Sequence, residues 1–133
     1  MIDIGVTINL YVGWLWILFG FLSGSLIGFN FHFLKENWLD GYSSPKRRLF
    51  RLGHISFFGL GFVNLIYYFT FNNLSSTSVL IDIASLGYVI GAITMPLCCF
   101  SIGVYPRVKN IFYIPVVSLI LSCFITVWEI FNI

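Results

Sequence analysis

The sequence predicts an all-α integral membrane protein with four transmembrane helices in a small bundle. Of its 133 residues, 59% are hydrophobic and 20% aromatic, whereas only 9% are charged. A soluble domain carries about 25% charged residues, so this composition is not that of a water-soluble globule. The seven basic and five acidic residues leave four uncharged segments, each longer than the roughly 18 residues that cross a bilayer. These segments are residues 4–34, 52–81, 83–106 and 110–128.

The chain is predicted to form one domain, residues 1–133, with spans at residues 10–33, 52–71, 79–103 and 111–131. The spans are expected to be helices because a lipid-exposed segment must satisfy its own backbone hydrogen bonds. They also lack the alternating pattern of a barrel strand. The loop 34–51 is the only polar segment of any length. Within it, Ser44 followed by Pro45 predicts a helix start, because serine caps helices and proline suits the first helical position.

The first span contains a row of glycines at every fourth position, which lets another helix backbone approach closely. These glycines are Gly20, Gly24 and Gly28. We expect the row to pack within the chain against the third span, where Gly87 and Gly91 form a matching flat surface. A helix of another subunit is an alternative partner. A porphyrin packed against the glycines is a third interpretation.

Polar side chains in the later spans are also expected to hold helices together. Asn64 lies near the middle of the second span, where an unpaired amide is costly, so it should bond across a helix interface. Asp82 and Glu129 lie at the ends of their spans, where carboxylates can stay hydrated. The three cysteines have no spacing typical of a redox, zinc or haem-attachment motif.

The distribution of basic residues predicts the orientation. All seven lie in two loops, whereas the loop between the second and third spans has none. The positive-inside rule places both basic loops in the cytoplasm and both termini on the non-cytoplasmic side. Aromatic residues agree, because tyrosine and tryptophan collect at membrane interfaces. Tyr11, Trp14, Trp16, Tyr67, Tyr68 and Trp128 mark the outer interface, and Trp38, Tyr42, Tyr105 and Tyr113 mark the inner one. We expect a membrane of the bacterial inner, or cytoplasmic, type.

Four basic residues form a cluster at the start of the second span. They are Lys46, Arg47, Arg48 and Arg51. At a membrane surface each basic residue contributes about 1 kcal/mol of attraction to anionic lipid, so contact with lipid headgroups is expected. An acidic surface of a partner subunit is the alternative. Nucleic acid is not an expected partner, because four charges beside a membrane make no extended groove.

The two histidines, His32 and His54, lie near the facing ends of the first two spans, at similar depth in a simple hairpin. Two histidines on different helices can hold a b-type haem, since neutral imidazole is a good iron ligand. The alternative is that each histidine bonds to headgroups, water or a neighbouring loop. A quinone or another ligand is a further interpretation of the pair.

The function predicted from these features is that of a non-catalytic accessory or structural subunit of a larger membrane complex, for example a respiratory or other energy-converting one. An enzyme is not expected, because the motifs of hydrolysis and phosphoryl transfer are missing. The first alternative is a haem b electron-transfer protein with His32 and His54 as ligands. The second alternative is a small transporter or channel, although coupled transport usually needs an ionisable residue deep in the membrane. The expected partners are membrane lipids and other integral membrane subunits.

Overall fold

The computed structural model describes residues 4–29, 37–72 and 78–132. Within these residues the chain is all-helical, without strands. Its long helices are α1 (Ile4–Phe29), α2 (Pro45–Phe71), α3 (Val79–Val104) and α4 (Tyr113–Asn132). Two short 3₁₀ helices, η2 (Trp38–Asp40) and η3 (Pro106–Phe112), precede α2 and α4. The four long helical segments are long and apolar enough to cross a membrane, which confirms the predicted all-α class.

Helix α1 begins at Ile4, earlier than the predicted residue 10, while residues 30–33 of the predicted span lie outside the described part. The early start has a packing reason, since Val6 and Asn9 on these first turns are both buried. Helix α2 begins at Pro45, as the sequence predicts. The Ser44 side chain accepts a hydrogen bond from the backbone N–H of Arg47 at 3.1 Å and so caps the helix.

Helix α4 starts with an irregular turn, which is explained by a proline. Pro115 has no N–H to donate to the carbonyl of Ile111 four residues earlier. The thiol of Cys98 on α3 donates to that oxygen instead, at 3.4 Å. Residues 106–112 form η3, so the regular α4 begins only at Tyr113.

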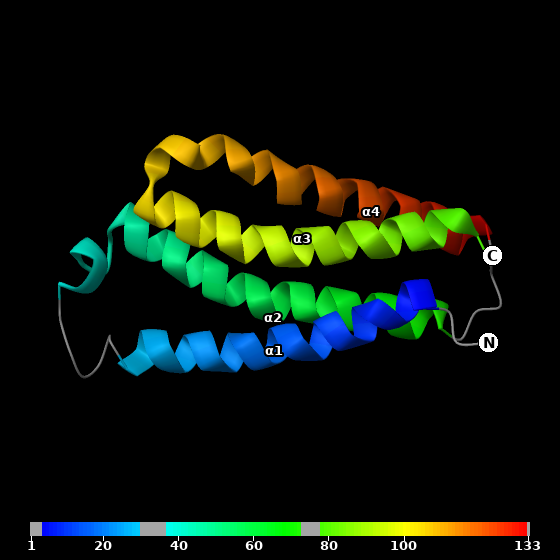
Figure 1. Cartoon of the computed structure of the whole chain (residues 1–133), viewed down its shortest axis with the longest axis horizontal. Coiled ribbons are helices and arrows are strands. Elements are labelled where there is room, and N and C mark those ends of the chain that lie inside the picture. Colours follow the sequence, from blue (N-terminus) through cyan, green and yellow to red (C-terminus); the bar gives the residue numbers. More distant parts are fainter. Residues whose placement is uncertain (1–3, 30–36, 73–77, 133) are drawn as a thin grey trace.

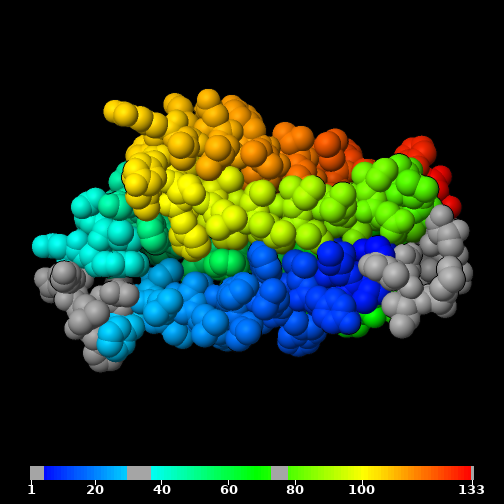
Figure 2. Space-filling model, in the orientation of Figure 1, coloured from blue at the N-terminus to red at the C-terminus, as the bar shows by residue number. Residues whose placement is uncertain are grey.

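The central helix is α3, which contacts all the others (Figure 1). Half of its most apolar stretch (50%) is buried, compared with 11% for α1 and for the segment containing α4. In the described part of the chain, α4 meets only α3 and η3. The arrangement is therefore a core of three helices with α4 attached along one side of α3, rather than a closed four-helix bundle. Figure 2 shows the same layering, with α3 between α4 and α1.

The start of α1 and the end of α4 lie at the same end of the molecule (Figure 1). The start of α2 and η3 lie at the opposite end, and they carry all the basic residues that the structure describes. We call these the terminal end and the basic end. Which of them faces the cytoplasm stays a prediction.

A cluster of buried apolar residues lies near the terminal end and includes Val6, Phe71, Ala84 and Tyr88. Tyr67 belongs to it, with an exposed fraction of 3%, and its hydroxyl donates to the carbonyl of Ile81 at 2.5 Å. Tyr67 therefore lies inside the fold, whereas the sequence predicted that its ring would lie at the outer interface.

Trp16 departs from its predicted interfacial role in a similar way. Its Nε1 donates to the carbonyl of Ala92 at 2.8 Å, and Ala92 lies in the middle of α3. An indole N–H that is removed from water needs such a partner. The bond joins α1 to α3 at mid-length.

Candidate functional site

A buried polar network joins the three core helices near the terminal end. Asn9 on α1 and Asn64 on α2 have no exposed surface, and Ser85 on α3 is 1% exposed. Asn9 Nδ2 donates to Asn64 Oδ1 at 2.8 Å, and the Ser85 hydroxyl contacts Asn9 Oδ1. Asn64 Nδ2 in turn donates to the carbonyl of Leu60 at 2.8 Å. The amide of Asn64 thus bonds across a helix interface, the role expected for it.

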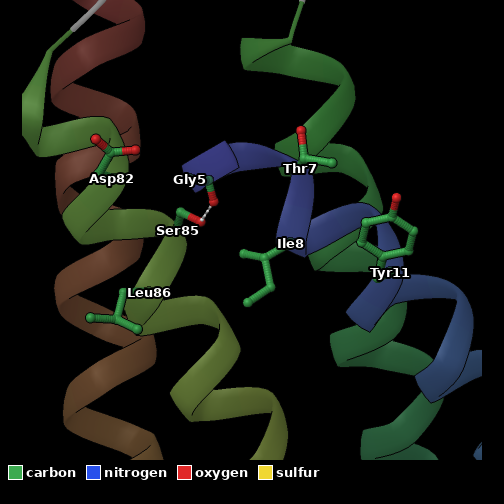
Figure 3. A pocket seen from close by; sticks show the side chains of 7 residues that line it. All are labelled: Gly5, Thr7, Ile8, Tyr11, Asp82, Ser85 and Leu86. Atoms are coloured by element: carbon green, nitrogen blue, oxygen red, sulfur yellow. Dashed lines mark hydrogen bonds between the residues drawn. The ribbon is translucent and has the colours of Figure 1, made fainter. Parts of the chain in front are cut away.

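A shallow groove of about 560 Å³ borders this network, between α1 and α3 (Figure 3). It is lined by Gly5, Thr7, Ile8, Tyr11, Asp82, Ser85 and Leu86. The Ser85 hydroxyl lies 2.6 Å from the carbonyl oxygen of Gly5 at its floor. Asp82 is exposed, and its place in the first turn of α3 is favourable for a carboxylate.

His54 packs against the first helix through small residues. Its Nδ1 lies 3.0 Å from the hydroxyl of Ser23, and a Cβ atom on Gly24 would lie 2.7 Å from its Cε1. The space beside Gly24 is therefore filled by the imidazole of His54. His32 lies outside the described residues, so the bis-histidine haem site stays a prediction, which the absorption spectrum of the reduced protein would test.

The two glycine rows do not face each other, so the expected match between them is wrong. A Cβ atom on Gly20 would lie 2.8 Å from the ring of Phe58, so the row on α1 packs against side chains of α2. On α3, Gly87 packs against Ser122 and Gly91 against Leu119, both on α4. No residue that the structure describes lies within 4 Å of a Cβ atom placed on Gly28. The glycine row on α1 packs against α2, because large rings of α2 fit over these glycines. The glycines of α3 contact α4 instead.

The contact between α3 and α4 combines these small residues with hydrogen bonds. The Ser118 hydroxyl donates to the carbonyl of Gly87 at 2.6 Å, and the hydroxyls of Tyr88 and Thr126 are 3.1 Å apart. Near the terminal end, the Ser78 hydroxyl donates to Glu129 Oε1 at 3.1 Å. Glu129 is only 8% exposed, so it is not the hydrated carboxylate that its position in the sequence suggested.

At the basic end, the loop before α2 folds over one arginine of the cluster. Arg47 is 3% exposed, and its guanidinium carbon lies 5.6 Å from the ring centroid of Trp38 and 5.4 Å from that of Tyr42. Arg51 lies over Tyr42 at 4.5 Å. Arg48 is exposed and Lys46 partly exposed, so contact with headgroups suits these two, while Arg47 is a structural residue of the loop.

The chain turns into α2 through three successive residues with positive φ: Leu39 at 53°, Asp40 at 64° and Gly41 at 91°. A leucine rarely adopts this conformation. This turn lies between Trp38 and Tyr42, the two residues whose rings cover Arg47.

Sequence reasoning missed Asn9, Ser85 and the bond of Trp16. Asn9 lies ahead of the predicted first span, although an amide inside the uncharged segment 4–34 is the kind of signal that singled out Asn64. Ser85 gives no comparable signal, because a serine in an apolar helix can bond to its own backbone.

No group of three histidine, cysteine, aspartate or glutamate side chains that could hold a metal ion occurs among residues 4–29, 37–72 and 78–132. No protein-family model, no curated protein and no solved structure matches this chain.

Proposed function

We propose that the protein is a small integral membrane protein whose role is carried by helix association, as an accessory subunit of a larger membrane complex. The observation that carries this proposal is the incomplete bundle. Among the described residues α4 packs only on α3 and the adjoining η3, and only 11% of the most apolar stretch of α1, and of the segment that contains α4, is buried. Such a molecule presents long apolar helix faces to its surroundings.

The use of polar side chains supports the same proposal. Asn9 bonds to both Asn64 and Ser85. Ser118 bonds from α4 to α3, and Thr126 bonds within α4. Hydrogen bonds and close backbone contacts are what drive helix association in lipid, where apolar side chains gain little by leaving the tails. The buried polar groups thus serve assembly of the fold, and the apolar exterior is left for lipid or partner helices.

The test is photo-crosslinking in native membranes. A photoreactive amino acid replaces Phe124, which is 71% exposed on α4, or Phe21, which is 65% exposed on α1. The expected result is an adduct of one discrete mass with a larger membrane protein, at one or both positions. The same substitution at Tyr88, which is buried between α3 and α4, is the control and should give no intermolecular adduct.

Recovery of the tagged protein as a lone monomer in mild detergent, with lipid adducts alone at both exposed positions, would overturn the accessory role. A stoichiometric partner that survives purification would support it.

A further inference from the structure

A second groove lies near the basic end, between α1 and the pair α2 and α3. Its volume is about 430 Å³. It is lined by Phe19, Leu22, Ser23, Leu26 and Ile27 of α1, Trp38 of η2, Phe50 and Phe57 of α2, and Phe100 of α3. Leu22 and Leu26 are 51% and 67% exposed, so the groove opens outward along α1. From this groove and the charges at its end we propose a binding site for one anionic phospholipid, with an acyl chain in the groove and its phosphate at Lys46.

Five aromatic rings form a continuous wall of the groove. The ring centroids of Phe19 and Phe57 are 5.9 Å apart, those of Phe57 and Phe100 6.2 Å, and those of Phe100 and Phe50 5.3 Å. Trp38 follows, at 6.2 Å from Phe50. This wall runs along the helices from the middle of α1 to the basic end.

The lining suits an apolar chain rather than a polar ring. Ser23 and the indole N–H of Trp38 are the polar side-chain groups among the nine lining residues. The Ser23 hydroxyl donates to the carbonyl of Gly20 at 3.2 Å and lies 3.0 Å from His54 Nδ1. Because that hydroxyl is already engaged and nearly all of the surface that lines the groove is apolar, a quinone carbonyl would find little to bond, whereas a hydrocarbon chain needs no polar partner.

Charge at the end of the wall selects an anionic headgroup. The guanidinium of Arg47 lies over the ring of Trp38, but Arg47 is 3% exposed and serves the loop. Lys46 lies one turn before Phe50 on the same face of α2 and is partly exposed. Its ammonium is therefore placed to bind a phosphate whose acyl chain runs along Phe50 and Phe57. The site requires that the helices span a bilayer, and it does not depend on a partner subunit.

Native mass spectrometry of the full chain tests both halves of the site, with dioleoylphosphatidylglycerol and dioleoylphosphatidylcholine as probes. We expect one phosphatidylglycerol to be retained in preference to phosphatidylcholine. The variant K46Q should lower that preference about fivefold, because one basic residue contributes about 1 kcal/mol to binding of anionic lipid. The control K109Q removes an exposed charge of η3 at the same end and should leave the preference unchanged.

The acyl-chain half is tested by filling the groove. L22W should abolish retention of phosphatidylglycerol, whereas L121W, on the exposed face of α4, should not change it. Equal binding of the two lipids by the unaltered protein, an equal effect of K46Q and K109Q, or full retention by L22W would each overturn the proposal.

A fluorescence measurement covers the case in which L22W does not fold. In a protein whose other tryptophans are replaced by phenylalanine, Trp38 should be quenched more strongly by chain-brominated phosphatidylglycerol than by brominated phosphatidylcholine at the same mole fraction. Equal quenching by the two lipids would contradict a specific site. The quenching result does not depend on whether partner adducts form in the crosslinking test. The lipid site and the accessory role can therefore fail independently of each other.

Discussion

Single buried polar residues are expected to have large effects in this protein, because few of them are buried and each has a defined partner. Asn9, Asn64 and Ser85 fix the relative register of three helices at one level. In a medium of low dielectric constant, the loss of one member leaves another unpaired, which costs more than the bond itself.

At this scale, replacing Asn64 by leucine, which has a similar shape, should lower the free energy of unfolding by about 1–2 kcal/mol. The reason is that Asn9 Nδ2 loses its shorter acceptor and retains only the carbonyl of Ser85, at 3.4 Å. Unfolding in detergent measures the change. The control is Thr94→Val, since Thr94 bonds only within its own helix, to Ile90, in the described structure, and a loss below about 0.5 kcal/mol is expected.

The double variant, with Asn9 and Asn64 both changed to leucine, should be less destabilised than the sum of the two single variants, because neither amide is then left alone. Additive effects would contradict the coupling of the two amides.

Arg47 is a second residue whose role depends on its surroundings. Arg47→Lys should lower stability by about 1 kcal/mol, because an ammonium does not stack on two rings as a planar guanidinium does. Thermal unfolding and the rate of proteolysis in the loop 37–44 are the measurements. Arg48→Lys, on an exposed position of the same turn, is the control, and an equal effect of the two changes would rule out the stacking role.

At the scale of elements, the packing of α4 on α3 depends on the absence of side chains at two positions. A Cβ atom on Gly87 would collide with Ser122, and one on Gly91 would collide with Leu119. Close backbone approach of this kind supplies much of the association energy of helices in lipid. Since α4 has no other helical neighbour than α3 and η3 in the described residues, its attachment depends on this contact, to which the two glycines contribute together with the hydrogen bonds of Ser118 and Thr126.

We therefore expect Gly87→Leu to weaken the contact between α3 and α4 by about 1–3 kcal/mol, the usual cost of overpacking. Cross-linking by a bifunctional maleimide between cysteines introduced at Tyr88 and Thr126, whose side chains meet, reports the contact in a background in which the three native cysteines are replaced by alanine. Gly28→Leu is the matched control, because no described residue lies within 4 Å of a Cβ atom at that position and no loss is expected. Normal cross-linking in the Gly87 variant would refute this account of the interface.

At the scale of the whole molecule, charge is divided between the two ends. The basic residues of α2 and η3 lie at one end, together with Asp40, and Asp82 and Glu129 lie near the other. For such a distribution of charge, the positive-inside rule predicts that the basic end faces the cytoplasm.

The orientation is tested by labelling with a membrane-impermeant maleimide, in a background in which the three native cysteines are replaced by alanine. A cysteine at Asn72, exposed at the end of α2, should react in intact cells, and one at Ser43, exposed before α2, should react only after lysis. Labelling of Ser43→Cys from outside would reverse the proposed orientation.

The class of the fold and the count of its helices follow from the sequence alone. Long uncharged segments have no stable alternative to helices in lipid, so their number and approximate positions can be predicted without tertiary information. The start of α2 was also predictable, because Ser44 and Pro45 act within one turn of the chain. The side chain of Asn64 was predictable in its role but not in its partner.

Only the tertiary structure decided which helix faces meet. Nearly every residue of a membrane helix is apolar, so the hydrophobic pattern that orients a helix in water says little here. For this reason the sequence predicts that the two glycine rows pack against each other. In the structure Gly24 packs against His54, and Gly87 packs against Ser122. Burial of Arg47 and Glu129 likewise depends on segments distant in the sequence or folded back by a turn, and their charge alone predicted exposure. Contacts between helices are set by the fit of particular side chains in three dimensions, and that fit has no counterpart in composition or spacing.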